Sequence, residues 1–431
     1  MAKGRKLTKT ERNLVIAVCL FSAFIVMRNM TAPLLSYIID SYPQYDETYV
    51  KTLTTVPGAV GAVVAFLIGP LCTVISRKKL MIFTAFTCMV YMLAFAFVGS
   101  NSMAVLMGVT YLVGFAQGAA AQLINGSMAE TFDGEERAKY IALAMGFFNF
   151  GTAMMSHIGG AIAGASNGAN WNQAYFAGFI YIPIILVLIF MMPNSKPKKG
   201  TTEELKAASG NKASWSEVFQ KGGLKKNFSA WLFLVILLQA VFYIGVQTYN
   251  TNISQYVIKE YELGTSAVSG FATSLYRYAG MIVGFIYPVL QKIFKKMIVP
   301  AGYLLTAVGT FMLFIKTDSV MNVYIASALL GAALNMANNT VYAKATLLTS
   351  PRFAGIALSL NATMQYLATS ISPYALKYGA VAVGGDNMPN RLIAGVIFAA
   401  VAGVLAIPLY LKDIRFANAS NKISAAAPEE E

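Results

Sequence analysis

Histidine and cysteine are scarce in this sequence, and their scarcity excludes several kinds of site. Among 431 residues there is one histidine, His157, and there are three cysteines, Cys19, Cys72 and Cys88. No Cys-x-x-Cys pair and no zinc-type spacing of Cys and His occurs, so structural zinc is not expected. A mechanism that needs two imidazoles is excluded, and we expect neither a metal nor another cofactor.

Charged residues are also few: they make up 12% of the sequence, whereas hydrophobic residues make up 57%. A soluble domain has about 25% charged residues, and the apolar residues here lie in long blocks, as in proteins that cross a bilayer several times. Neither a phosphate-binding loop of the Gly-x-x-x-x-Gly-Lys-Ser/Thr type nor a His-Glu-x-x-His motif occurs. We therefore expect a membrane protein that is not an enzyme and does not hydrolyse ATP.

The apolar blocks predict an all-α integral membrane protein with twelve transmembrane helices. Each block has about 20 residues or more and is bounded by charges or by Gly, Pro, Asn or Asp. None shows the short alternating segments that transmembrane strands need. The predicted helices lie near residues 13–38, 48–72, 80–99, 103–128, 138–165, 171–193, 228–255, 264–290, 297–317, 320–346, 353–376 and 390–411.

A polar stretch divides these helices into six plus six. We expect an N-terminal six-helix bundle over residues 1–193, a cytoplasmic linker over 194–227, a C-terminal six-helix bundle over 228–411 and a cytoplasmic tail over 412–431. The start of the linker is rich in Lys, Ser, Thr and Gly, which is typical of a solvated tether. Within it, Ser214–Phe219 fits the start of a short helix at the membrane surface.

The net charge of +14 follows the predicted topology. If the N-terminus is cytoplasmic, 26 of the 33 Lys and Arg residues fall on cytoplasmic segments and two lie within helices. The positive-inside bias therefore places both termini in the cytoplasm. We expect a monomer in the plasma membrane, with the lipid bilayer and no nucleic acid as partner. The five remaining basic residues face outside: Lys51, Lys259, Lys316, Lys377 and Arg391.

Two pairs of matched segments indicate an internal repeat. Pro70–Lys78 matches Pro288–Lys296 at an offset of 218, and Arg137–Leu143 matches Arg352–Leu358 at an offset of 215. Both matches occur at the same place in each half, after the second helix and before the fifth. The two halves are predicted to be homologous bundles.

With these features the chain resembles the major facilitator superfamily over nearly its whole length. The loop signature Gly-x-x-x-Asp-x-x-Gly-Arg-Lys of that family aligns with Gly69, Thr73, Ser76, Arg77 and Lys78. The resemblance implies two six-helix bundles around a central cavity, with Gly69, Arg77 and Lys78 in a loop that takes part in conformational change. Thr73 replaces the acidic residue of the signature. In the family's fourth-helix pattern Arg-x-x-Gln-Gly, Gly114 replaces the arginine often tied to proton transfer.

Two arginines lie deep in predicted helices, and no carboxylate lies at comparable depth. Arg28 is in the first helix and Arg277 in the eighth, so each half contributes one. A buried charge costs at least ~2.5–3.5 kcal/mol on insertion scales, so it needs a partner, a water-filled cavity or a function. An anionic ligand held by bidentate hydrogen bonds would supply the missing charge. Hydrogen bonds to helix carbonyls, or snorkelling to an interface, are the alternative.

Amide and tyrosine side chains form stripes on the fourth, seventh, tenth and eleventh helices. Because an amide facing lipid would lack hydrogen-bond partners, the stripes should face protein or a polar cavity. Hydrogen bonds between helices would account for each amide equally well. The candidate substrate-binding residues are Arg28, Gln117, Tyr243, Gln247, Asn250, Arg277, Tyr278, Asn335, Asn338, Asn361 and Gln365.

The expected function is secondary active or facilitative transport by alternating access. The favoured substrate is a small organic anion, a carboxylate or a phosphorylated metabolite. Export of amphipathic drugs is the main alternative, supported by Met- and Phe-rich helices and by glycines of the fifth helix. A sugar or polyol permease comes third, and a receptor without transport is a further class.

Energy coupling is predicted from the carboxylates that the central helices lack. An arginine cannot cycle a proton, and His157 is expected to lie near the outer surface in a structural role. We expect exchange of anions or uniport rather than proton-driven transport.

Overall fold

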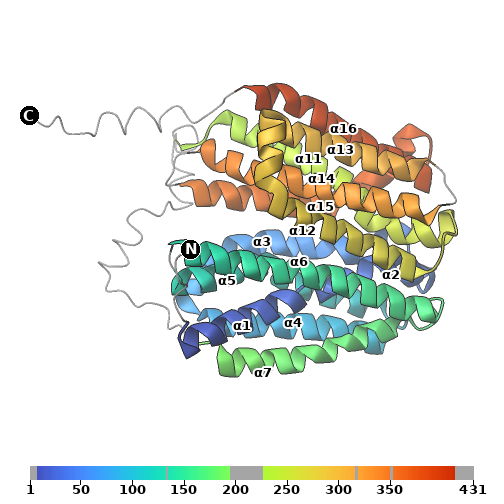
Figure 1. Ribbon diagram of the computed structural model, residues 1–431. Coiled ribbons are helices and arrows are strands. Elements are labelled where there is room, and N and C mark those ends of the chain that lie inside the picture. The colour runs from blue at the N-terminus through green and yellow to red at the C-terminus, as the bar shows by residue number, and fades with distance from the viewer. Residues whose placement is uncertain (1–6, 133, 195–226, 316–318, 350–352, 413–431) are drawn as a thin grey trace, which may run out of the picture.

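A computed structural model describes residues 7–132, 134–194, 227–315, 319–349 and 353–412 of the chain. Two helical bundles lie side by side, one from each half of the sequence (Figure 1). The helices of the N-terminal half are α1 (Lys9–Phe24), η1 (Met27–Met30), α2 (Thr31–Asp40), α3 (Glu47–Val74), α4 (Arg77–Val98), α5 (Met103–Thr131), α6 (Gly134–Ala165), η2 (Trp171–Ile180) and α7 (Tyr181–Met191).

The C-terminal half repeats the pattern of long helices joined by short connections. Its helices are α11 (Ala230–Gln255), the π-helical turn η3 (Tyr256–Glu260), α12 (Ser266–Phe294), η4 (Lys295–Met297), α13 (Ile298–Phe314), α14 (Val320–Leu347), α15 (Ala354–Val383) and α16 (Met388–Leu411).

The described residues confirm the predicted all-helical membrane fold. Ten stretches of them are long and apolar enough to cross a bilayer, and one of these, Ser266–Phe314, contains both α12 and α13. The 30-residue helix α15 is also long enough to cross. These helices are consistent with the twelve predicted. Many begin at a side-chain N-cap, as the sequence favours: Thr8, Asp46, Ser76, Ser102, Ser229, Thr265 and Asn387.

The molecule has two ends, which we name by the chain segments found there. At the terminal end α1 and α11 begin and α7 and α16 end; at the distal end lie the connections 41–46, 166–170 and 384–387 (Figure 1). Each half has its own hydrophobic core, one in the N-terminal half and two clusters in the C-terminal half. The predicted helix at Ser214–Phe219 lies outside the described residues.

The two halves meet chiefly through α6 against α12 and α3 against α15. Gly160 of α6 faces Gly270 of α12 so closely that a Cβ on Gly160 would lie 2.3 Å from the Ser266 carbonyl oxygen. Toward the terminal end the same two helices expose large apolar side chains, such as Phe147 on α6 and Phe285 on α12. The close approach of α6 and α12 at Gly160 and Gly270 therefore lies toward the distal end.

Candidate functional site

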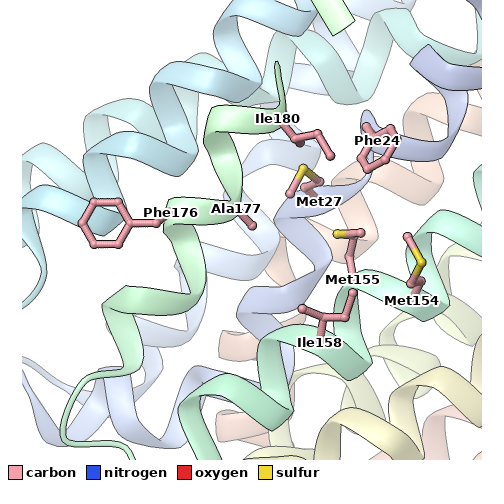
Figure 2. A pocket seen from close by; sticks show the side chains of 8 residues that line it. All are labelled: Phe24, Met27, Met154, Met155, Ile158, Phe176, Ala177 and Ile180. Carbon is pink, nitrogen blue, oxygen red and sulfur yellow. The ribbon is translucent and has the colours of Figure 1, made fainter. Parts of the chain in front are cut away.

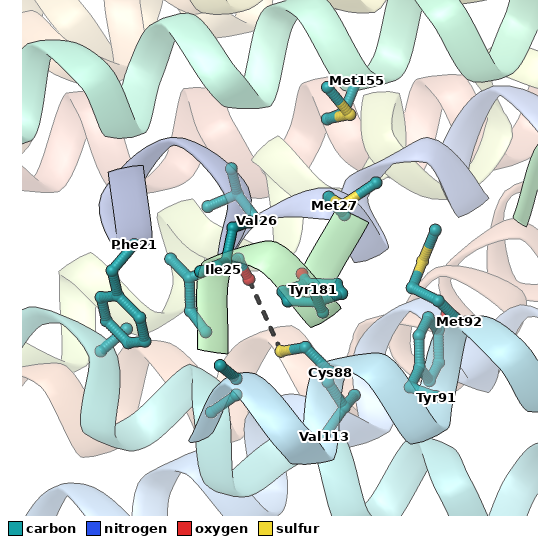
Figure 3. Packing of buried hydrophobic residues seen from close by; sticks show 14 of the residues in the cluster. Phe21, Ile25, Val26, Met27, Cys88, Tyr91, Met92, Val113, Met155 and Tyr181 are labelled. Atoms are coloured by element: carbon teal, nitrogen blue, oxygen red, sulfur yellow. Dashed lines mark hydrogen bonds between the residues drawn. The ribbon is translucent and has the colours of Figure 1, made fainter. Parts of the chain in front are cut away.

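The first predicted helix is interrupted at Arg28. Residues 25–30 leave the α-helix, and Arg28 lies on the 3₁₀ turn η1. Irregular backbone at membrane depth needs hydrogen-bond partners for its freed carbonyls. Tyr181 donates its hydroxyl to the Phe24 carbonyl at 2.5 Å, and the Cys88 thiol donates to the Ile25 carbonyl at 3.8 Å (Figure 3). Side chains of α4 and α7 thus hold the turn that carries Arg28.

Arg28 and Arg277, here called the central arginines, lack a protein counter-ion. Among the described residues neither forms an ion pair or a side-chain hydrogen bond, and the buried Nε of Arg277 has no partner. Both side chains are partly exposed. The two guanidinium groups lie close enough to interact electrostatically, with Tyr91 and Tyr366 beside Arg28. Two cations from opposite halves therefore lie within electrostatic range of each other, and no carboxylate among the described residues pairs with them.

The Arg277 guanidinium also packs against an aromatic wall. Its central carbon lies 5.1 Å from the centre of the Tyr276 ring, within the range of a cation–π contact. The Tyr276 ring stacks on Tyr249 of α11, with ring centres 5.0 Å apart. Tyr278, also predicted as a site residue, is half-buried.

Three predicted site residues join in an amide cluster within the C-terminal half, defined as Gln239, Tyr243, Asn338, Tyr342 and Gln365. The Oδ1 of Asn338 accepts hydrogen bonds from Gln239 Nε2 at 3.0 Å, Gln365 Nε2 at 3.2 Å and Tyr243 OH at 3.4 Å. Tyr342 OH donates to Gln365 Oε1 at 3.1 Å. These bonds link α11, α14 and α15. The amides of this cluster thus form hydrogen bonds between helices, which was the alternative to substrate binding. The cluster borders the central arginines.

The remaining predicted amides divide into bonded and unbonded groups. Gln247 donates to Thr369 at 3.2 Å, and Asn250 donates to Gln247 at 3.3 Å. Asn335 donates to a carbonyl of its own helix at 3.1 Å. By contrast, both side-chain polar atoms of Asn361 and the Oε1 of Gln117 are buried without a hydrogen-bond partner. A buried polar atom without a partner costs about 1–3 kcal/mol, so a ligand or water is the natural partner.

Close packing explains why glycine stands in place of the fourth-helix arginine of the family pattern. A Cβ on Gly114 would lie 2.5 Å from the Val60 side chain, and one on Gly118 would lie 2.4 Å from the Gly61 carbonyl oxygen. Helix α5 therefore approaches α3 too closely for any side chain at these positions. An arginine at position 114 would not fit this arrangement.

Two residues of the predicted conformational loop tie helices of the N-terminal half together. Arg77 donates from Nη1 to the Gly126 carbonyl of α5 at 2.7 Å, and Lys78 donates to the Ile189 carbonyl of α7 at 2.6 Å. Gly69 lies on α3. Both side chains begin α4, so the start of this helix anchors its two neighbours at the terminal end.

His157 lies on the surface of the molecule rather than among the candidate site residues. Its side chain is exposed, and its ring makes an edge contact with Phe271 of α12, with ring centres 5.6 Å apart.

An apolar cavity of about 450 Å³ lies beside the interrupted helix. Phe24 and Met27 form one wall, and residues of α6 and η2 form the rest (Figure 2). Its lining contains no charged side chain. The cavity and Arg28 therefore lie next to the same turn of the chain.

Sequence reasoning missed a group of charges at the distal end. Lys51, predicted to face outside, is buried and lies 2.5 Å from the Glu47 carboxylate. Glu47 also pairs with Arg391 of α16. The i, i+4 spacing of Glu47 and Lys51 was a visible signal for the first pair, whereas nothing in the sequence links either residue to Arg391.

Comparison with known proteins agrees with this architecture. The profile described as Major Facilitator Superfamily matches residues 16–373, and the chain belongs to that family. It is a membrane transporter of this type rather than an enzyme. No curated protein matches the sequence.

Similar solved structures are transporters of several kinds. A mutant of the peptide transporter POT has a TM-score of 0.72 at 13% identity, covering 93% of each chain. A mutant of the nucleoside transporter NupG has a TM-score of 0.72 at 12% identity and covers 92% of this chain and 99% of its own. A D-xylose-proton symporter has a TM-score of 0.68 at 15% identity, covering 92% and 97%. At such identities the likeness concerns the fold.

Proposed function

We propose that this transporter carries a small organic anion, a carboxylate or a phosphorylated metabolite, by exchange or uniport. The observation that supports the proposal is the pair of central arginines without a protein counter-ion, one from each half. Two guanidinium groups can hold a carboxylate or phosphate through bidentate hydrogen bonds. A site between two repeats near the membrane midplane is where alternating access can expose a ligand to each side.

The polar groups around the arginines suit the remainder of such a substrate. Gln117 Oε1 and the side chain of Asn361 lack protein partners, and Tyr243 makes only a long hydrogen bond of 3.4 Å to Asn338. A hydroxyl or amino group on the anion can supply partners for these atoms. The proposed site therefore comprises the central arginines with Gln117, Tyr243, Asn361 and their neighbours.

The proposed orientation places the terminal end in the cytoplasm and the distal end outside the plasma membrane. The positive-inside bias supports this orientation. In it, the close approach of Gly160 to α12 lies toward the outer side of the membrane. We also propose that the carrier works as a monomer.

The test is a thermal-unfolding screen of the purified carrier with carboxylates, phosphate esters, sugars and lipophilic cations. A ligand that prefers the folded carrier must raise its unfolding temperature, and we expect anions to do so. Arg277→Gln should abolish this stabilisation, whereas Arg12→Gln, at the exposed start of α1, should keep it. Stabilisation by lipophilic cations alone would contradict the anion proposal.

Whether transport is coupled to a proton gradient is tested separately in vesicles preloaded with the stabilising anion. Because no described carboxylate pairs with the central arginines, counterflow should persist after an ionophore collapses the proton gradient. A strict requirement for an imposed pH gradient would show that transport is proton-driven.

Drug or amphipath export is the second candidate, because the apolar cavity lined by Phe24, Met27 and further Met and Phe side chains suits a lipophilic group. The same unfolding screen separates it from anion transport.

A further inference from the structure

The ion pairs that join the halves at the distal end all run in the same direction. Three carboxylates of the N-terminal half, Asp40, Asp46 and Glu47, each contact a cation of the C-terminal half. Their partners are Lys259, Lys377 and Arg391, respectively. In every pair that joins the halves here, the acid comes from the first half and the base from the second.

Lys51 lies at the centre of this arrangement. Its side chain is 2% exposed, and its Nζ donates to Asn252 Oδ1 of α11 at 2.7 Å while pairing with Glu47 of its own helix. A buried ammonium is tolerated only where partners satisfy it. One of its partners belongs to the opposite half, so Lys51 is satisfied in this way only while the halves are together.

Arg391 remains satisfied when the halves separate. It donates from Nε and Nη2 to the Asp386 carboxylate of its own half, at 2.6 and 2.9 Å. Only its bond from Nη1 crosses to Glu47. Both cations near Glu47 therefore keep a carboxylate of their own half when the halves separate, although Lys51 loses its bond to Asn252.

The same residues explain why basic side chains occur at this end at all. Of the five Lys and Arg residues that the sequence places outside, Lys51, Lys259, Lys377 and Arg391 bind across the halves or to Glu47. The fifth, Lys316, lies outside the described residues. Four of the five exceptions to the positive-inside bias thus take part in these contacts.

We propose that Asp40, Asp46, Glu47, Lys51, Lys259, Lys377, Asp386 and Arg391 form an electrostatic gate, which closes the distal end of the transport path. Opening separates an acidic rim on the first half from a basic rim on the second. The inference rests on the alternating-access cycle of a transporter, but on neither the anionic substrate nor the mode of coupling.

The experiment reports opening directly and needs no substrate. In a carrier with Cys19, Cys72 and Cys88 replaced by serine, Thr55→Cys places a thiol on α3, where Ser370 of α15 now covers the Thr55 carbonyl and the residue is buried. Labelling by a membrane-impermeant maleimide, added at the distal side, then measures how often that end opens. Glu47→Gln should raise the labelling rate about tenfold or more. Glu260→Gln is the matched control, because Glu260 is an exposed carboxylate near the same end that forms no ion pair among the described residues.

A charge-swap experiment distinguishes loss of the ion pair from a general loosening of the fold. Asp46→Lys alone and Lys377→Asp alone should each raise labelling about three- to tenfold, since each sets like charges against each other. The double variant restores opposite charges with reversed polarity and should return labelling to within about twofold of the parent. Labelling of Glu47→Gln at the parental rate, or a double variant that labels no more slowly than either single variant, would overturn the gate. A negative substrate screen would leave these rates unaffected and would count against the anion proposal alone.

Discussion

Lys51 and Arg391 at the distal end are buried and the central arginines are partly buried, but the surroundings of the two pairs differ in kind. Lys51 and Arg391 have carboxylates within hydrogen-bond distance. Arg28 and Arg277 have none among the described residues, and they come from opposite halves. A cation paired within the protein stabilises one conformation of the protein. A cation left unpaired destabilises the empty carrier and is relieved when an anion binds.

Because of this difference, replacing a distal cation and replacing a central arginine should change the stability of the carrier in opposite directions. Removal of a distal cation should cost stability, because it leaves a carboxylate and an amide without their partner. Removal of a central arginine should cost little stability or even add some, while it removes ligand binding. The following predictions test this contrast.

The largest effect is expected at Lys51. Lys51→Met leaves Asn252 Oδ1 and one side of Glu47 unsatisfied at a site that is otherwise buried. Breaking a buried pair costs about 3–5 kcal/mol, and we expect about 3 because Glu47 retains Arg391 and is partly exposed. Thermal unfolding of the detergent-solubilised carrier measures the loss, with the exposed Lys79→Met as a control. An unfolding temperature unchanged by Lys51→Met would contradict the assigned role.

Arg277→Gln should change binding by a large factor and stability by a small one. Loss of a charge-assisted hydrogen bond is worth about 1.5–3 kcal/mol, or roughly 10- to 150-fold in affinity. The empty variant should unfold at the same temperature as the parent or above it. Affinity comes from titration of the anion found in the screen. A variant that binds normally but unfolds early would place Arg277 among the structural cations instead.

Asp46→Asn should have a modest effect, because both members of the Asp46–Lys377 pair are partly exposed. Its Oδ2 lies 2.8 Å from Lys377 Nζ, and water screens the attraction in such exposed pairs. We expect distal labelling to rise up to about fivefold. The difference from the parent should shrink in 1 M salt, where the Debye length is about 3 Å. An effect that grows with salt would exclude a simple ion pair.

The pH dependence of this pair follows from the Asp46 carboxyl, because the hydrogen bond from Lys377 holds its pKa below the usual range. A lowered folded-state pKa means that the stabilisation is fully present above the ordinary value of about 3.9 and is lost as the pH falls through the lowered value. The contribution of Asp46 to closure should therefore be constant from pH 5 to pH 8. The labelling ratio of Asp46→Asn to parent, measured across that range, should be flat.

His157→Gln is expected to have the smallest effect. The imidazole is exposed on the surface and contacts Phe271 rather than either central arginine. Counterflow should change less than twofold. Loss of transport in this variant, with normal unfolding, would make the only histidine a coupling group.

Most of the fold was predictable because bilayer thickness imposes long apolar segments on the sequence. The predicted blocks overlap the helices of the described residues. The interruption at residues 25–30 was not predicted. No Pro or Gly lies within it, and the side chains that hold its carbonyls, Cys88 and Tyr181, come from distant helices.

The candidate site was predictable in composition but not in pairing. The depth of Arg28 and Arg277 followed from hydropathy alone. Whether an amide bonds to another helix depends on rotation and distance, so sequence could not separate Asn338, which accepts three hydrogen bonds, from Asn361, which has none. Glu47 and Arg391 are 344 positions apart, and no local pattern connects them.

The contact between Asp40 and Lys259 bears on how a duplicated chain acquired this closure. These residues lie 219 positions apart, within one residue of the repeat offset of 218, so they occupy nearly equivalent places in the two halves. In a symmetric pair of identical bundles, a residue near the two-fold axis faces its own copy. Aspartate would then meet aspartate, and lysine would meet lysine, which repel. In this chain the two halves have diverged here, so opposite charges meet where identical side chains on the axis would repel.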